Sequence, residues 1–141
     1  MAHSFPSEAW AAAYKVAING NETYKTAGKD WTHGAVGMVV KADPSIGIEQ
    51  DMAVLLDVHA GVCNDATYLT ADEARSSAPF VIEGPYDNWK KLIVENQDPI
   101  KALMQGKLKL TKGHLPTIIR YVESSKQLLA SAQTVDTQFK R

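Results

Sequence analysis

Near the start of the chain, apolar residues recur at intervals of three and four positions, which is the spacing of one helix face. This stripe consists of Trp10, Ala13, Tyr14, Ala17 and Ile18. Ser7 is suited to cap the helix because its hydroxyl can accept a free backbone N–H, and residues 19–21 (Asn-Gly-Asn) supply a stop. A second short helix is expected to follow, with Tyr24 and Trp31 facing the same core.

From Gly34 the apolar period changes to two, which is typical of β-strands. The predicted strands cover residues 34–40, 52–59, 66–69, 79–83 and 107–111. In the first strand the face with Val36, Met38 and Val40 and the opposite face are both apolar, so neither is expected to meet bulk water. The short connections between the first three strands favour antiparallel pairing.

The second half of the chain alternates between helical and extended patterns. Residues 70–77 are polar and predict a helix or a loop. Asp87 is expected to cap one helix, and Asp98 followed by proline begins the next, in the favoured order for a helix start. Pro116 is expected to open one long C-terminal helix with a broad apolar band. These elements together predict an α+β fold with one mostly antiparallel sheet.

The size and composition of the chain narrow its class. Its 141 residues suffice for one domain with a hydrophobic core but not for two, so we expect a single domain over residues 1–141. The composition is 45% hydrophobic and 22% charged, which excludes intrinsic disorder. The longest nearly apolar run, residues 35–40, is too short to cross a bilayer. Cys63 is the sole cysteine and the N-terminus lacks a signal-peptide pattern, so a cytoplasmic location is expected.

The distribution of charge is uneven along the chain. The formal net charge is −1, without the basic excess of a nucleic-acid-binding protein, so no nucleic-acid partner is expected. Residues 1–100 carry seven basic and fourteen acidic side chains, a net charge of −7, whereas residues 101–141 carry eight basic and two acidic side chains, a net charge of +6. Attraction between two parts of one fold is the simpler interpretation, and a basic face for anionic membranes is the functional alternative.

Residues of catalytic type occur around the second predicted strand. Asp57 and His59 lie two positions apart on one strand face, with Cys63 and Asp65 just beyond. Such groups can form a metal site or an acid–base pair. No phosphate loop, dinucleotide-binding glycine pattern or His-Glu-x-x-His motif accompanies them. The pattern therefore favours hydrogen bonding at the sheet edge, and no catalytic residue, metal or cofactor is expected.

The chain has more apolar surface than a single sheet layer obviously fills. Trp10, Trp31 and Trp89 occupy core-facing helical positions, where packing is favoured over stacking on a ligand. Strand 34–40 is apolar on both faces, and several helices carry wide apolar stripes. Either helices cover both faces of the sheet, or part of this surface lines a cavity for a hydrophobic ligand.

Residues 98–110 read DPIKALMQGKLKL. This segment resembles the sterol carrier protein family of lipid-binding and lipid-transfer domains, in which an Asn/Asp-Pro helix start leads through an apolar pair into a Gly-Lys-Leu-Lys strand. The order of the other predicted elements agrees with that family. The resemblance implies a five-stranded, mainly antiparallel sheet covered by helices that enclose an apolar tunnel. It also implies a domain that binds sterols, fatty acids or fatty-acyl-CoA without catalysing a reaction.

By position within this resemblance, thirteen apolar residues are candidates to line the tunnel and bind the ligand. They are Val36, Met38, Val54, Leu56, Phe80, Ile82, Leu103, Met104, Leu108, Leu110, Ile118, Ile119 and Val122. Methionines suit a site that adapts to varied chains.

Three functional hypotheses remain open at this point. The first is a non-catalytic lipid carrier whose partner is a hydrophobic small molecule, with transient membrane contact. The second is a small enzyme on an apolar substrate, using Asp57 and His59 with Cys63 nearby. The third is a homo-oligomeric interaction module, for instance a homodimer, whose spare apolar surface is an interface.

Overall fold

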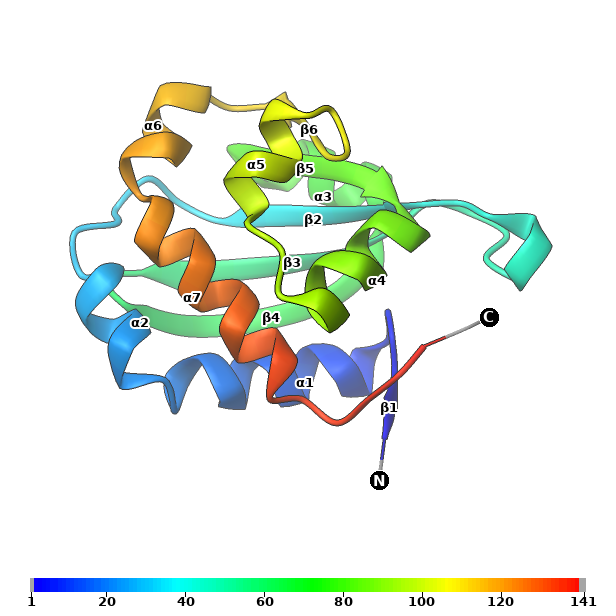
Figure 1. The fold of residues 1–141 in the computed structure, drawn as a ribbon, viewed down its shortest axis with the longest axis horizontal. Helices are drawn as coiled ribbons and strands as arrows, with labels where there is room; N and C mark the ends of the chain where they lie inside the picture. Colours follow the sequence, from blue (N-terminus) through cyan, green and yellow to red (C-terminus); the bar gives the residue numbers. More distant parts are fainter. Residues whose placement is uncertain (1, 140–141) are drawn as a thin grey trace.

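A five-stranded sheet forms the centre of the molecule, which we describe from a computed structural model covering residues 2–139 (Figure 1). Its spatial order is β4-β3-β2-β5-β6. The strands are β2 Val36–Lys41, β3 Met52–His59, β4 Val62–Thr70, β5 Phe80–Pro85 and β6 Lys109–Lys112. Three residues lie outside the described range: Met1, Lys140 and Arg141. The last two belong to the C-terminal charge count.

The pairing of the strands confirms the predicted fold class. β2, β3 and β4 form an antiparallel meander, β5 runs parallel to β2, and β6 runs antiparallel to β5. β3 has the predicted bounds, whereas β4 begins four residues earlier than predicted. The reason is a tight turn at Ala60 and Gly61, whose φ angles of 52° and 82° suit a two-residue hairpin. A short second sheet, absent from the prediction, pairs β1 His3–Ser4 with β7 Thr137–Gln138.

Seven α-helices lie around the sheet within the described residues. They are α1 Glu8–Asn19, α2 Glu22–Ala27, α3 Ala71–Ser77, α4 Tyr86–Glu95, α5 Pro99–Met104, α6 Leu115–Arg120 and α7 Val122–Gln133. Two predicted caps are confirmed, because the Ser7 side chain accepts from the Trp10 N–H and the Asp98 carboxylate accepts from the Ile100 N–H. None of these helices is long and apolar enough to cross a bilayer.

Three local predictions were wrong. Asp87 lies inside the first turn of α4, where a carboxylate favours the helix dipole, and Pro85 occupies the capping position. The fifth strand begins at Lys109, two residues later than predicted. The C-terminal helix is broken at Tyr121 into α6 and α7, and the Tyr121 hydroxyl there donates to the Asp30 carbonyl, 3.0 Å away.

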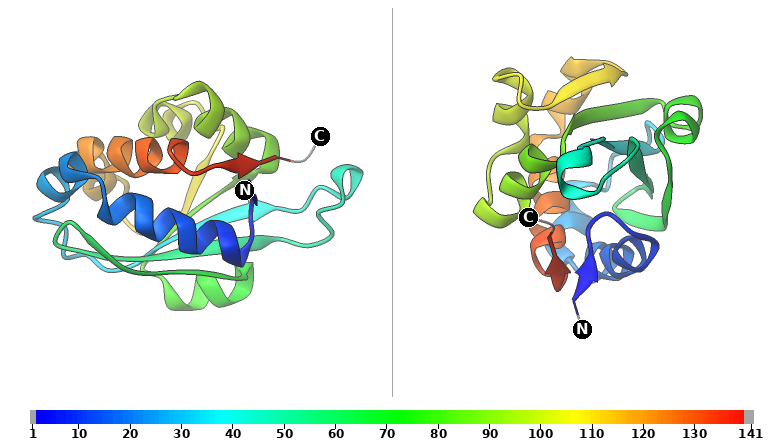
Figure 2. Two further views of the ribbon diagram at one scale, coloured as in Figure 1. Left: turned by 90° about the horizontal axis from the view of Figure 1, so that it is seen from below. Right: turned by 90° about the vertical axis from the view of Figure 1, so that its right-hand side faces the viewer.

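Strand alternation divides the apolar residues between the two faces of the sheet. The inner face carries Met38, Leu56 and their neighbours, and it is covered by α1, α4, α5, α6 and α7. The outer face carries Val39, Ala53 and Val81 and packs against α3, which lies by itself below the strands in the left view of Figure 2. Both faces are therefore covered, which explains why strand 34–40 is apolar on both sides.

Candidate ligand-binding site

An apolar cavity of about 80 Å³ lies between the inner face of the sheet and the helices that cover it. Its lining comes from several strands and from helices across the whole chain. The lining residues are Tyr14, Tyr24, Trp31, Val36, Met38, Leu56, Val58, Ile82, Trp89, Leu92, Pro99, Ile100, Leu103, Leu108, Ile118, Tyr121, Ser124, Ser125, Leu128 and Leu129.

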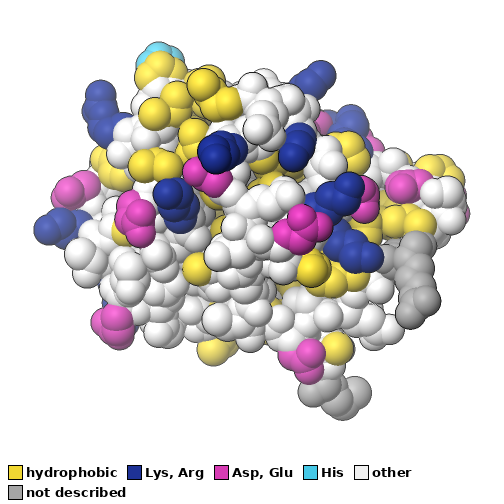
Figure 3. Space-filling view, in the orientation of Figure 1, with side chains coloured by type: hydrophobic (Ala, Val, Ile, Leu, Met, Phe, Trp, Pro, Cys, Tyr) yellow, Lys and Arg dark blue, Asp and Glu magenta, His cyan; other side chains and the backbone are white. Residues whose placement is uncertain are grey.

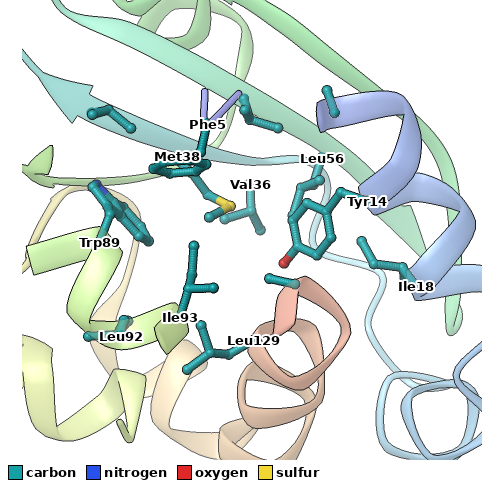
Figure 4. Close-up of a cluster of buried hydrophobic side chains, with 14 of the residues drawn as sticks. Phe5, Tyr14, Ile18, Val36, Met38, Leu56, Trp89, Leu92, Ile93 and Leu129 are labelled. Carbon is teal, nitrogen blue, oxygen red and sulfur yellow. The ribbon is translucent and has the colours of Figure 1, made fainter. Parts of the chain in front are cut away.

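The sheet supplies the floor of this cavity through strand periodicity. Val36 pairs with Leu56, and Met38 pairs with Ile82, so side chains of three strands gather at one level of the inner face. Figure 4 shows Val36 and Met38 pointing from the sheet toward Leu129 on the C-terminal helix. Because successive strand residues alternate in direction, every second residue of these strands points to the inner face, and five of them, Val36, Met38, Leu56, Val58 and Ile82, line the cavity.

Amphipathic helices supply the roof. Trp89 and Leu92 are three positions apart on α4 and therefore share its inward face. The Trp89 indole N–H donates to the Val39 carbonyl at 2.8 Å, which ties this helix to the sheet. On α1, the buried Tyr14 ring reaches across to α7, where its hydroxyl donates to the Leu128 carbonyl at 2.8 Å.

The polar groups of the lining are tyrosine and serine hydroxyls and two tryptophan indoles, and burial keeps the hydroxyls of Tyr14 and Tyr24 neutral. Burial raises the pKa of Tyr24 to about 12, aided by the nearby Cys63 and opposed by a hydrogen bond with Ser124. Burial, together with Cys63 and Tyr24, raises the pKa of Tyr14 above its usual value. No lining residue in the described part of the chain carries a charge. The cavity therefore suits the apolar part of a ligand and offers no counter-ion to a charged head group.

The cavity comes closest to solvent on one side. Its half-buried lining residues, apart from Ile82, belong either to α5 or to residues 121–128. Those from α5 are Pro99, Ile100 and Leu103, and Tyr121 lies at the break between α6 and α7. The remaining lining residues are buried, so α5 and the start of α7 form the boundary between cavity and solvent.

The structure brings together seven of the thirteen residues proposed from the sequence. Those lining the cavity are Val36, Met38, Leu56, Ile82, Leu103, Leu108 and Ile118. Val54 and Phe80 are buried in the same core but do not reach the cavity, and Leu110 packs against that core half-buried. Contact of any of these residues with a ligand stays a prediction.

The other three candidates lie away from the cavity. Met104 is 68% exposed and Ile119 is 41% exposed, and Val122 is half-buried without reaching the lining. Helix geometry explains the first two, since consecutive residues point about 100° apart. Leu103 and Ile118 face the cavity, so their successors Met104 and Ile119 point elsewhere.

Most of the lining that the sequence-based set omits comes from helices. Tyr14, Trp89 and Leu129 belong to apolar stripes that the sequence does show, but a stripe does not distinguish a filled core from a cavity wall. The buried Ser124 and the half-buried Ser125 carry no such signal, because local sequence does not show that a serine faces the interior. Only the packing of α7 among the other helices on the inner side of the sheet reveals them.

The alternative chemical cluster does not converge on the cavity. Asp57 and His59 are both exposed, and neither lines it. Cys63 is buried, and burial raises the pKa of its thiol to about 11, although a hydrogen bond with the Asp65 backbone lowers it. Within residues 2–139, no group of three or more His, Cys, Asp or Glu side chains could hold a metal ion.

Comparison with known proteins identifies close structural neighbours. A crystal structure of sterol carrier protein 2 matches with a TM-score of 0.83 and 33% identity, covering 92% of this chain and 97% of that one. A conserved hypothetical protein from Thermus thermophilus, whose description proposes a sterol carrier protein, matches with a TM-score of 0.83 and 32% identity over 94% of this chain and 90% of its own. Sterol carrier protein 2 from Yarrowia lipolytica shares the fold at 16% identity and a TM-score of 0.55, over 87% of this chain and 88% of its own. No family model and no curated protein matches the sequence.

Proposed function

This chain belongs to the sterol carrier protein family, and on that premise we propose that it carries a lipid by enclosing its apolar part in the cavity beneath α5 and α7. The ligand is a sterol, a fatty acid or the acyl chain of a fatty-acyl-CoA. The observation that carries this proposal is the uncharged lining, drawn from both the sheet and the helices. Each methylene group transferred from water into such a site contributes about 0.8 kcal/mol, so a chain of several carbons binds without specific polar contacts.

The size of the cavity implies that the covering helices move when a ligand enters. An apolar cavity of about 150 Å³ can hold benzene, and this one measures about 80 Å³. A sterol or a long acyl chain therefore needs additional space. The half-buried side chains of α5 and of residues 121–128 are the part of the wall that can separate at the lowest cost, because they already contact solvent. Extension of the cavity into a tunnel is part of this proposal.

We propose a carrier and not a catalyst. The lining contains no acid, base, thiol or histidine within the described residues. The enzyme hypothesis required Asp57 and His59 to face the apolar site, and both are exposed outside it. The raised pKa of the buried Cys63 thiol disfavours the thiolate that a nucleophile requires.

Some of the expectations from sequence stay predictions. These are the action of residues 1–141 as one domain, a cytoplasmic location, contact with membranes and formation of a homodimer. The homodimer is tested by sedimentation at micromolar concentration, and a monomer there would contradict this prediction.

The test of the proposed function is direct measurement of bound lipid. Organic extraction of the purified protein, with mass spectrometry of the extract, is expected to yield a sterol, a fatty acid or an acyl compound. A fluorescent fatty acid is expected to bind and to be displaced by unlabelled lipid. An empty extract together with no fluorescent binding would overturn the proposal.

A pair of variants locates the binding in the cavity. Val36→Phe places an aromatic ring in the cavity wall and is expected to weaken fluorescent fatty-acid binding at least tenfold. The matched control Val16→Phe makes the same change on α1, where Val16 is 72% exposed, and is expected to leave binding unchanged. Ser125→Leu serves as a second cavity variant should Val36→Phe not fold. Equal binding by a folded cavity variant and the control would contradict the assignment.

A further inference from the structure

A ligand whose apolar part lies in the cavity has to place its polar end elsewhere. The lining carries no charge within the described residues, and burial of a polar group without a partner is costly. The half-buried part of the wall lies at α5 and residues 121–128, so the polar end of the ligand is expected to leave the cavity there. The surface directly outside this part of the wall therefore decides which head groups fit.

A groove of about 370 Å³ with a polar lining lies against that part of the wall. Its lining comes from α7 and from the connection between α4 and α5. The residues are Asn96, Gln97, Asp98, Glu123, Lys126, Gln127, Leu129 and Ala130. We call this set of eight residues the polar groove.

The polar groove and the apolar cavity are neighbours on both of their sides. On α7, residues 123, 126, 127 and 130 line the groove, whereas residues 124, 125 and 128 line the cavity, and Leu129 lines both. These are adjacent faces of one helix. On the opposite side, Asp98 lines the groove and the next residue, Pro99, lines the cavity. A ligand that leaves the cavity between α5 and α7 would therefore place its head group in the polar groove.

A second depression, beside α5, is farther from the cavity. It shares Gln97 and Asp98 with the polar groove and adds Lys101 and Lys107. None of its lining residues within the described part of the chain also lines the apolar cavity. A head group attached to a tail in the cavity consequently meets the polar groove first.

The polar groove offers hydrogen-bond acceptors and donors together. Asp98 accepts from a backbone N–H at 2.9 Å and Glu123 accepts from the Gln127 side chain at 3.2 Å, each through one carboxylate oxygen. Within residues 2–139, no ion pair joins Lys126 and no hydrogen bond engages the side-chain amide of Asn96. Two carboxylates and one ammonium group give the lining a formal charge of −1. Figure 3 shows acidic and basic side chains interspersed on this face, over α5 and α7.

We propose that the polar groove holds an uncharged lipid head group with several hydroxyls, such as the glycerol of a monoacylglycerol. This inference rests on the proposed lipid-carrying function and names the head group of its ligand. A hydroxyl both donates to a carboxylate and accepts from an ammonium or amide group, so it suits every kind of polar atom in the lining. The phosphates of a CoA ester, in contrast, would lie beside two carboxylates with one cation to offset them. A purely cationic head group would leave the donors of Lys126 and Asn96 without an acceptor.

The first test compares two head groups on the same acyl chain. Monooleoylglycerol and oleoyl-CoA each compete with the fluorescent fatty acid, below the concentrations at which they form micelles. The concentration of monooleoylglycerol that displaces half of the probe is expected to be severalfold lower than that of oleoyl-CoA. Equal displacement, or a preference for oleoyl-CoA, overturns the head-group inference.

A pair of variants tests the charges of the polar groove. Asp98→Asn/Glu123→Gln keeps the size of both side chains, and asparagine also caps a helix, so the start of α5 is retained. Removal of two negative charges is expected to bring oleoyl-CoA severalfold closer to monooleoylglycerol in displacement. The matched control Glu49→Gln/Asp57→Asn makes the same charge change at two exposed carboxylates outside the groove and is expected to keep the original difference. An equal shift in the variant and its control would contradict a role of the groove.

A second pair of variants tests the volume of the polar groove. Ala130→Phe places a ring in the groove, and the control Ala12→Phe makes the same change at an exposed position of α1. Only Ala130→Phe is expected to weaken displacement by monooleoylglycerol severalfold, whereas both variants are expected to bind the fluorescent fatty acid like the unmodified protein. Equal displacement in the two variants overturns the head-group inference alone. Loss of fatty-acid binding by the unmodified protein overturns the proposed function itself.

Discussion

On the outer face of the sheet, α3 packs alanines directly against the strands, whereas on the inner face the helices approach through tryptophan, tyrosine and leucine. A methyl group at Gly37 on the outer face would lie 3.5 Å from the Ala74 methyl and 3.6 Å from that of Ala78, so the two backbones are close. The inner face is bridged by long side chains such as Trp89 and Tyr14. Small residues permit close contact on the outer face. On the inner face α1 also lies close to β4, whereas large side chains hold α7 away from the strands.

The electrostatics of the two faces differ in the same way. On the outer face, Arg75 of α3 donates two hydrogen bonds to Glu83, at 2.7 and 3.0 Å, and pairs with Asp51 and Asp72. The cavity lining on the inner face has no charge in the described residues. The outer face is thus held by short contacts between charged groups, whereas the inner face combines apolar packing with neutral hydrogen bonds such as that from Trp89 to the Val39 carbonyl. This division is consistent with the proposal that the inner face adapts to a ligand.

The largest effect is expected from shortening Trp89, the side chain that links α4 to the inner face of the sheet. Trp89→Ala is expected to lower the free energy of unfolding by about 3–5 kcal/mol, because it removes a buried aromatic ring and leaves a larger cavity. Trp89→Phe retains most of the ring and is expected to cost about 1–2 kcal/mol, chiefly from the lost hydrogen bond to the Val39 carbonyl. Urea unfolding measures both. Equal losses for the two variants would show that the ring does not hold the helix off the sheet.

The next prediction compares the two faces by placing a leucine side chain on each: on α3 at the closely packed outer face, and on α7 beside the cavity. Ala74→Leu on α3 is expected to destabilise by about 1–3 kcal/mol, because Ala74 is fully buried against the sheet. Ser125→Leu on α7 directs a similar side chain into the cavity and is expected to leave the free energy of unfolding unchanged within about 1 kcal/mol.

Thermal and urea unfolding of these two variants decide between the alternatives. A cost for Ser125→Leu as large as that for Ala74→Leu would mean that the inner face is packed as tightly as the outer one. The cavity would then not provide spare volume for a ligand.

The sequence separated the two faces of the strands but did not determine which of them lines the cavity. Strand alternation placed Val36, Met38 and Leu56 together because a period of two has one geometric meaning. The contribution of Tyr14 from α1 could not be anticipated, since no local pattern says how far a helix stands from a sheet. The break at Tyr121 is equally non-local, since no Gly or Pro accompanies it and its hydroxyl bonds to Asp30, 91 positions away.

The ligand-binding candidates that turned out to be exposed show a second limit of prediction from sequence. A broad apolar stripe on a helix includes residues on its margins, and sequence alone assigns them to the core. Met104 and Ile119 belong to such margins and lie in solvent. Six-residue helices such as α5 and α6 give too few turns for the centre of a stripe to be located.

The smallest predicted effect concerns pH and only the outer face. The hydrogen bonds from Arg75 hold the pKa of Glu83 below its ordinary value of 4.5, against the effect of burial. A carboxylate whose pKa is lowered by folding stabilises the protein above its unfolded pKa, and this stabilisation is lost as the pH falls through the lower folded pKa. The pKa of Asp51 is also lowered. Burial raises it, but hydrogen bonds from the Ala42 N–H, Lys41 and Arg75 lower it by more.

Glu83→Gln is therefore expected to lower the free energy of unfolding by about 1 kcal/mol at pH 7 and to flatten its decline below pH 4.5. The control Glu49→Gln, at an exposed carboxylate, is expected to follow the unmodified protein throughout. Urea unfolding at a series of pH values measures the slope. Fatty-acid binding by Glu83→Gln at pH 7 is expected to be unchanged, because the charge lies on the face opposite the cavity. A loss of binding with the stability intact would show that the two faces are coupled and that the outer contacts help to shape the site.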